Sequence, residues 1–355
     1  MNKDVVKQLA AKLKNLRLER KLSIMEVCGT HTAAFFHTGV KDLFPDGLTL
    51  TDGPGCPVCV TANEYLDRAI EIGRVHNAIL AAFGDMIRVP SSYSSLAESK
   101  AEGIDVRVVY SPLEAIAIAE ANPARPVVFL SVGFETTAPA EAACVLEAKA
   151  RGVSNFFILA GNKTTPPAVR ALLDAQEVRI DGFIIPGHVS TIIGENPWSF
   201  IADEYGRAGV ITGFAAGELL AGTLTLLDFI AQGKKEIANC YKTFVSPDGN
   251  RRAVEIINKV FEPADANWRG LGVIPKSGLS VRGEFAEFDA ERVLPVTPPP
   301  VKEHVGCRCG DLLRGLISPP DCPLFDTACK PERPVGPCMV SSEGPCAAYY
   351  KYWRR

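Results

Sequence analysis

The chain has 355 residues and a formal net charge of -3, and 47% of its residues are hydrophobic while 22% are charged. This length and composition indicate a folded chain with two or three packed domains. The Lys and Arg residues are scattered and lack the clustering that is typical of a nucleic-acid-binding protein, so this class of protein is not expected. No apolar run is long enough to span a membrane. Residues 1–21 have charged and apolar residues at helical spacing but lack the apolar core of a secretory signal. We therefore expect a cytoplasmic protein.

Short apolar, β-branched runs alternate with helical patterns through the centre of the chain. This alternation is typical of βαβ units, and continuously apolar strands indicate parallel sheets covered by helices on both faces. The sequence therefore predicts an α/β fold. The expected strands are 78–83, 106–110, 127–132, 156–160, 182–186 and 209–213.

Three domains are expected from this organisation. Residues 1–122 form an α/β domain whose loops carry the first three cysteines, and residues 123–235 form a second α/β domain. Residues 236–355 contain many Pro and Gly residues, which break the βαβ rhythm, so they are predicted to form a third, irregular domain.

Two loops that follow expected strands share the pattern G-x-x-T-T-x-P, at residues 133–139 and 161–167. One interpretation is a shared turn from strand to helix, with Thr as the cap and Pro in the first helical turn. The other, given equal weight, is a ligand crevice at the carboxyl ends of the strands. Its lining would be Glu135, Thr136, Thr137, Asn162 and Lys163.

Four other loops also follow expected strands, and in an α/β fold they would meet at one edge. They are EVCGTHT (26–32), TDGPGCPVC (51–59), FGDMI (83–87) and IPGHVS (185–190). Their side chains are rich in soft and borderline metal ligands and in groups that titrate near neutral pH. The candidate side chains are Cys28, His31, Cys56, Cys59, Asp85 and His188.

Cys56 and Cys59 have the spacing of a C-x-x-C motif, and residues 60–73 have the apolar spacing of a helix. A thiol at the start of a helix has a lowered pKa, so a reversible disulfide is physically reasonable. A structural zinc site is an alternative, and a metal held by one thiolate is equally compatible with the spacing. The other ligands of a zinc site would be Cys28 and either His31 or His37.

Six further cysteines crowd residues 307–346. An iron-sulfur cluster and a zinc site each take four thiolates, and spacing alone does not separate these two alternatives. An irregular chain leaves backbone N–H groups free to bond to cluster sulfurs, which favours the cluster. The remaining Cys144 and Cys240 lie in segments with helical patterns and are expected to be core thiols.

Several of these motifs, in the same order, resemble the HypD family of nickel-iron hydrogenase maturation proteins. The resemblance runs from about residue 21 to the C-terminus and rests on EVCGTHTAAFFHTG, TDGPGCPVCVT, FGDMIRVPSS, SVGFETTAPA, AGNKTTPP, IPGHVS and CMVSSEGPCAAYYKY. It implies a cytoplasmic protein that works with the small chaperone HypC and with HypE, which delivers cyanide. Such a protein and HypC together hold iron while an Fe(CN)2CO unit is assembled, before the unit passes to the hydrogenase large subunit.

The resemblance also implies roles for particular residues. Cys28 would bind the iron together with a thiolate of the chaperone, and His31 beside it would hydrogen-bond or transfer a proton. Cys56 and Cys59 would form a redox pair that exchanges electrons with a four-iron four-sulfur (4Fe-4S) cluster. The cluster ligands would be Cys307, Cys322, Cys329 and Cys346, leaving Cys309 and Cys338 spare.

Two alternatives from other functional classes remain: an iron-sulfur-dependent protein disulfide reductase and a zinc-stabilised interaction protein. The sequence has neither a G-x-x-x-x-G-K-[ST] loop nor a G-x-G-x-x-G turn, so no motif gives a reason to expect nucleotide binding. Glu343 is expected to have a surface role and not a catalytic one. We expect a monomer that forms mixed complexes and acts as an assembly scaffold with redox activity.

Overall fold

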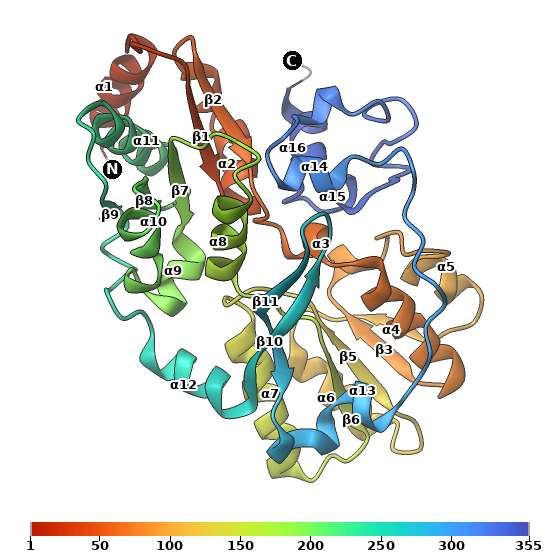
Figure 1. The fold of residues 1–355 in the computed structure, drawn as a ribbon. Helices are drawn as coiled ribbons and strands as arrows, with labels where there is room; N and C mark the ends of the chain where they lie inside the picture. The colour runs from red at the N-terminus through yellow and green to blue at the C-terminus, as the bar shows by residue number, and fades with distance from the viewer. Residues whose placement is uncertain (1, 354–355) are drawn as a thin grey trace.

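The computed structural model describes residues 2–353, which form a mixed α/β fold with two parallel sheets, as the sequence predicts. The five-stranded sheet has the order β2 (Leu48–Asp52), β1 (Leu22–Glu26), β7 (Gly182–Pro186), β8 (Ala208–Thr212) and β9 (Ile237–Asn239). The four-stranded sheet has the order β4 (Val106–Val108), β3 (Ile79–Ala82), β5 (Val127–Ser131) and β6 (Phe156–Ala160). An antiparallel hairpin of β10 (Phe261–Trp268) and β11 (Gly272–Val281) lies between the two sheets in Figure 1.

Helices connect the strands. The helices of eight or more residues are α1 (Lys3–Lys14), α2 (Gly29–His37), α4 (Asn63–Val75), α6 (Pro112–Ala121), α7 (Ala138–Arg151), α8 (Thr165–Ala175), α11 (Ala216–Ala231), α12 (Arg251–Val260) and α16 (Pro345–Tyr352). The shorter α-helices are α3 (Pro57–Val60), α5 (Leu96–Ala101), α9 (Gly187–Ile193), α10 (Phe200–Asp203), α13 (Ala290–Val293), α14 (Cys309–Leu313) and α15 (Pro337–Val340). Short 3-10 helices are η1 (Lys41–Leu43), η2 (Gly84–Met86), η3 (Asn196–Trp198), η4 (Gly283–Phe288) and η5 (Pro319–Asp321).

All six strands predicted from apolar runs are present. Strands β3, β5, β7 and β8 are buried along their whole length, which explains their continuous apolar sequence. The ranges of β1, β2 and β9 were not predicted, because β2 alternates apolar with polar residues (LTLTD) and β9 has only three residues.

The sheets do not follow the order of the chain. Strand β3 pairs with β5, so the predicted boundary between residues 122 and 123 falls between two strands of one sheet. The five-stranded sheet begins with β1 and β2 and is completed by β7, β8 and β9, more than 100 residues later. Hydrophobic periodicity identifies strands, but it carries no information about which strands pair.

Residues 236–294 are more regular than the prediction of an irregular domain beginning at residue 236. Phe261 and Val281 of the hairpin share a buried core with Val127 of the four-stranded sheet. The irregular cysteine-rich segment therefore begins after α13, and Figure 1 shows it in blue beside α2 and α3. Cys144 is buried in α7 as predicted, whereas Cys240 follows strand β9 and is not in a helix.

Candidate functional site

Cys28 lies where β1 ends and α2 begins. It is the N-cap residue of α2, and its own backbone N–H donates a hydrogen bond to Glu26 Oε2 at 2.7 Å. The loop before the C-x-x-C motif runs directly against it, since Gly29 N donates to the carbonyl oxygen of Gly55 at 2.8 Å. Only glycine fits at this contact, because a Cβ on Gly55 would lie 2.1 Å from the backbone nitrogen of Cys28. Two predicted loops, 26–32 and 51–59, therefore meet.

Cys56 and Cys59 form a disulfide with a Cα–Cα distance of 5.2 Å. Cys56 is the N-cap of the short helix α3, and its Sγ accepts a hydrogen bond from the backbone N–H of Cys59 at 3.2 Å. The predicted helix after the motif is present as α3 followed by α4. The exposed fractions of Cys56 and Cys59 are 2% and 0%, so the disulfide is closed to solvent.

Two buried carboxyl groups lie behind Cys28. Glu26 and Asp52 are partners in the register of β1 and β2. Burial first, and then the charge of Asp52, raises the pKa of Glu26 well above its ordinary value. Thr32 donates its hydroxyl to the same carboxyl group. This carboxyl group therefore fixes the turn that presents Cys28.

His31 and His188 flank one aromatic ring. The ring of Phe214 stacks on His31 with a centroid separation of 4.5 Å and on His188 with one of 3.9 Å. His31 is fully buried, its Nε2 lies 3.2 Å from the carbonyl oxygen of Gly213, and burial lowers its pKa to about 4. A neutral imidazole at this position can accept or donate one hydrogen bond but carries no charge. The 185–190 loop thus joins the same edge.

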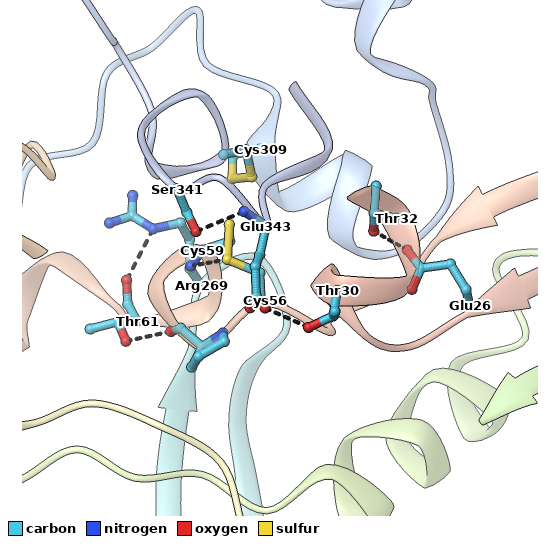
Figure 2. The surroundings of a disulfide bond; sticks show 12 residues. Glu26, Thr30, Thr32, Cys56, Cys59, Thr61, Arg269, Cys309, Ser341 and Glu343 are labelled. Atoms are coloured by element: carbon cyan, nitrogen blue, oxygen red, sulfur yellow. Dashed lines mark hydrogen bonds between the residues drawn. A yellow bond between two sulfur atoms is a disulfide. The ribbon is translucent and has the colours of Figure 1, made fainter. Parts of the chain in front are cut away.

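Glu343 also belongs to this region, contrary to the surface role expected for it. Thr30 donates its hydroxyl to Glu343 Oε1 at 2.6 Å, and a Cβ on Gly29 would lie 2.5 Å from the Cβ of Glu343 (Figure 2). Burial raises the pKa of Glu343, and the charge of Asp85 raises it further. No sequence signal pointed to this contact, because 313 residues separate the two side chains.

Burial and the neighbouring carboxylates raise the pKa of the Cys28 thiol. Burial has the largest effect, followed by the charges of Glu26 and Glu343, and together they raise this pKa to about 12. Cys28 is therefore a thiol at neutral pH, since the backbone N–H groups of His31 and Thr30 lower its pKa by less than burial raises it; a bound cation would favour its thiolate.

The six C-terminal cysteines line one apolar cavity together with Leu312, Phe325 and Met339. Cys309 and Cys338 form a disulfide within it. The four remaining cysteines are free thiols: Cys307, Cys322, Cys329 and Cys346. These thiols are close enough to interact electrostatically, because the pKa of Cys346 is raised first by burial and then by the other three thiols. In residues 2–353, no three His, Cys, Asp or Glu side chains are grouped closely enough to hold a single metal ion.

Four free thiols line this one apolar cavity, and a 4Fe-4S cluster takes four thiolates. Backbone geometry is also suitable, since the N–H of Val335 donates to Cys329 Sγ at 3.3 Å. Gly336 lies so close that a Cβ there would be 2.6 Å from Cys307 Sγ. The thiol set thus fits the ligand number and surroundings of a 4Fe-4S cluster.

The two disulfides are neighbours in space. Helix α15, which contains Cys338, contacts α3, and Figure 2 shows the Cys309 disulfide next to the Cys56–Cys59 pair. Arg269 at the tip of the hairpin joins this region, because its guanidinium donates to the carbonyl oxygen of Thr61 at 3.1 Å. Sequence spacing did not predict this pairing of disulfides.

The two G-x-x-T-T-x-P loops differ from each other in the structure. Proline lies in the first turn of both α7 and α8, as predicted, but neither N-cap threonine side chain makes a capping hydrogen bond. Instead Glu135 accepts the backbone N–H of Thr165 at 2.7 Å, and burial raises the pKa of Glu135 to about 7. Of the five residues predicted to line a crevice, Asn162 and Lys163 line a cavity beside the hairpin, and the other three do not.

Comparisons with known proteins identify the family of this chain. Residues 3–353 match the HypD family model, described as "Hydrogenase formation hypA family". The chain is 42% identical over 360 residues to the hydrogenase maturation factor HypD of Cupriavidus necator, covering 99% of this chain and 95% of the relative. It is 43% identical over 335 residues to HypD of Escherichia coli, covering 94% and 90% respectively. None of the helices within residues 2–353 has the length and apolar character needed to cross a membrane. The chain belongs to the HypD family of hydrogenase maturation factors.

Proposed function

We propose that this chain, together with a HypC-type chaperone, holds iron while its cyanide and carbonyl ligands are attached during nickel-iron hydrogenase maturation. Cys28 would bind the iron, and a HypE-type protein would donate cyanide. The observation that carries this proposal is the contact between the backbone of Cys28 and Gly55, which places the Cys28 loop against the C-x-x-C loop, while the neighbouring Gly29 and Thr30 contact Glu343. The hydrogenase large subunit would receive the finished Fe(CN)2CO unit.

A resident 4Fe-4S cluster held by Cys307, Cys322, Cys329 and Cys346 is part of the proposal. Four free thiols in one apolar cavity, with the other two cysteines joined to each other, support this ligand set. Such a cluster supplies or accepts one electron at a time.

The neighbouring disulfides support a redox role for Cys56 and Cys59. Reduction of one disulfide takes two electrons and two protons and gives two thiols, and those thiols return the same electrons when they reoxidise. The electrons would come from an external one-electron carrier protein. The Cys309–Cys338 pair lines the thiol-rich cavity, and α15, which contains Cys338, contacts α3, so this pair would exchange electrons with the first pair.

His31 and Glu26 would orient Cys28 and not carry charge to the iron. Burial lowers the pKa of His31 and so holds it neutral, and the stack on Phe214 fixes its ring. Glu26 accepts the Cys28 backbone N–H and so fixes the direction of the thiol. A thiolate suits low-spin ferrous iron, and metal binding would release the Cys28 proton to solvent or to a nearby carboxylate.

Infrared spectroscopy in the cyanide and carbonyl stretching region tests the proposal. The chain is co-expressed with a HypC-type chaperone and purified anaerobically as wild type, Cys28→Ala and Cys144→Ala. Cys144 is the matched control, because it is also a buried free cysteine but lies in α7, where its thiol donates to the carbonyl oxygen of Pro112. Bands present in wild type and Cys144→Ala and absent in Cys28→Ala, with unchanged acid-labile sulfide, are expected. Equal bands in all three proteins would show that Cys28 does not hold the iron.

The adjacent disulfides also favour a second candidate, an iron-sulfur-dependent protein disulfide reductase. It would reduce the disulfide of another protein with electrons from the cluster and would require Cys56 and Cys59 but not Cys28. Turnover of a protein disulfide by the isolated chain, with no iron-cyanide bands after co-expression, would favour it over the scaffold.

A further inference from the structure

A second cavity lies on the four-stranded sheet, apart from the thiols. It has a volume of about 360 Å³ and is bounded by the start of α4, the end of β6, the hairpin and residues near α13. None of the cysteines lines it. Its size is in the range of small-molecule sites, and its place at the carboxyl end of a parallel strand is where α/β folds bind ligands.

Lys163 is the unusual residue of this cavity. Its exposed fraction is 6%, although it carries an ammonium group. Its backbone is fixed, because its N–H donates to the carbonyl oxygen of Gly133 at 3.0 Å and the residue bridges to Gly278 of β11. The side chain is therefore held in place by the sheet and the hairpin.

No carboxylate within residues 2–353 is paired with the Lys163 ammonium group. Its Nζ lies 5.8 Å from the ring centroid of Trp268, a distance at which a cation–π contact is weak to moderate. Burial alone lowers the pKa of Lys163 to about 8, with no opposing effect from an acidic neighbour. A desolvated ammonium group without a counter-ion is costly.

The other charged groups of the cavity already have partners. Arg68 pairs with Glu64 at 3.2 Å and with Glu291 at 3.1 Å. Asp265 accepts the backbone N–H of Lys276, and Asp289 pairs with Arg292. Among the described residues of the lining, Lys163 is the cation that lacks a carboxylate partner, and it is buried, whereas the carboxylate of Asp265 is bonded to a backbone N–H. An anion from outside the chain would supply the partner that Lys163 lacks.

The charge of the lining restricts that anion. Four carboxylates and two cations line the cavity, so its net negative charge disfavours a doubly charged anion such as phosphate more strongly than a singly charged one, whose charge the Lys163 ammonium group can match. The hairpin contributes backbone groups as well, since its register shifts between Ala264 and Ala266 and leaves main-chain polar groups outside the ladder. A small polar molecule with one carboxylate could pair with the Lys163 ammonium group and hydrogen-bond to the main-chain groups of the hairpin.

We propose that this cavity binds a small monocarboxylate, whose carboxylate pairs with Lys163 and whose remainder lies against the hairpin. This site is separate from Cys28 and does not depend on the proposed maturation function. Its occupant would contact both α4 and the hairpin.

Ligand-detected NMR on the full-length chain tests the proposal, with acetate and glycine as probes at constant ionic strength and inorganic phosphate as the doubly charged comparison. The variants are Lys163→Met and Lys276→Met. Lys276 is the matched control, because it is an exposed lysine of the same hairpin. Saturable binding of acetate or glycine to wild type and Lys276→Met, weakened about tenfold or more in Lys163→Met, is expected.

Equal binding by Lys163→Met, no saturable binding of either monocarboxylate, or tighter binding of phosphate would each overturn the proposal. If Lys163→Met does not fold, the test uses the wild-type chain. The rate at which an amine-reactive reagent labels Lys163 is then measured by peptide mass spectrometry with and without acetate. Selective slowing at Lys163 and not at Lys276 supports the site, and an unchanged rate refutes it.

Discussion

Gly55→Ala tests whether the position of Cys28 against the C-x-x-C loop is needed for iron binding. The added Cβ would lie 2.1 Å from the backbone nitrogen and 2.4 Å from the Cα of Cys28, where ordinary contacts begin at 3.4 Å. The two loops must therefore separate by roughly 1 Å or more. This movement would also stretch the 2.8 Å hydrogen bond from Gly29 to Gly55.

The expected cost follows from these two effects. Overpacking against backbone costs about 1–3 kcal/mol, and a lost hydrogen bond costs about 1 kcal/mol more, so we expect Gly55→Ala to lower the free energy of unfolding by about 2–4 kcal/mol. A displacement of this size also disrupts site geometry, so the loss of iron-cyanide bands should exceed the loss of folded protein.

Gly283→Ala is the matched control, because a Cβ there meets no atom within 4 Å and the residue is exposed. Urea denaturation gives the free energy of unfolding of each variant, and infrared bands of the folded fraction report iron binding. We expect the control to lie within about 0.5 kcal/mol of wild type. If Gly55→Ala matches the control in both measurements, the close contact does not position Cys28.

Three further predictions concern stability and electron transfer. Burial raises the pKa of Glu135 to about 7, so the stability that its protonated form contributes is fully present below its ordinary pKa and is lost as pH rises through 7. Relative to wild type, Glu135→Gln should therefore raise the free energy of unfolding by up to about 3 kcal/mol above pH 7 and by little near pH 4. Urea denaturation at several pH values measures this difference. Gly270→Ala should destabilise the chain by about 1–3 kcal/mol more than Gly272→Ala. Both glycines have positive φ, but a Cβ on Gly270 would lie 2.2 Å from the Cα of Gly310, which follows Cys309, whereas a Cβ on Gly272 meets no atom within 4 Å. Equal free energies of unfolding for the two variants would contradict this contact. Cys338→Ser should leave acid-labile sulfide unchanged while slowing reduction of Cys56–Cys59 by a one-electron donor, measured by thiol labelling; an unchanged rate would remove the second disulfide from the electron path.

The sequence predicted those parts of the fold that depend on local pattern. Continuously apolar strands such as β5 and β7 were identified because each is buried on both faces. The hairpin was missed because β10 has partly buried and exposed residues between its buried ends and contains Pro263, a residue typical of irregular chain. Strand partners such as β3 and β5 depend on tertiary packing and could not be assigned.

The candidate site was predictable in composition but not in its contacts. The sequence placed Cys28 and His188 on loops after strands, and the structure joins those loops through Phe214, an apolar residue with no distinctive motif. Glu343 was misjudged because its partner Thr30 is distant in sequence. The predicted roles of these residues in binding iron and transferring electrons remain predictions.

Burial of the disulfides separates the two candidate functions. Cys59 is fully buried, and Cys56, Cys309 and Cys338 have exposed fractions of 2%, 4% and 1%. Thiol-disulfide exchange with another protein requires a thiolate to reach one sulfur in line with the disulfide, which these sulfurs do not permit in the described conformation. Reduction through a neighbouring cluster needs no such access, because electrons pass between buried groups in contact. If Cys56 and Cys59 transfer electrons as proposed, their burial favours chemistry inside this chain, because a protein disulfide reductase would first have to expose α3.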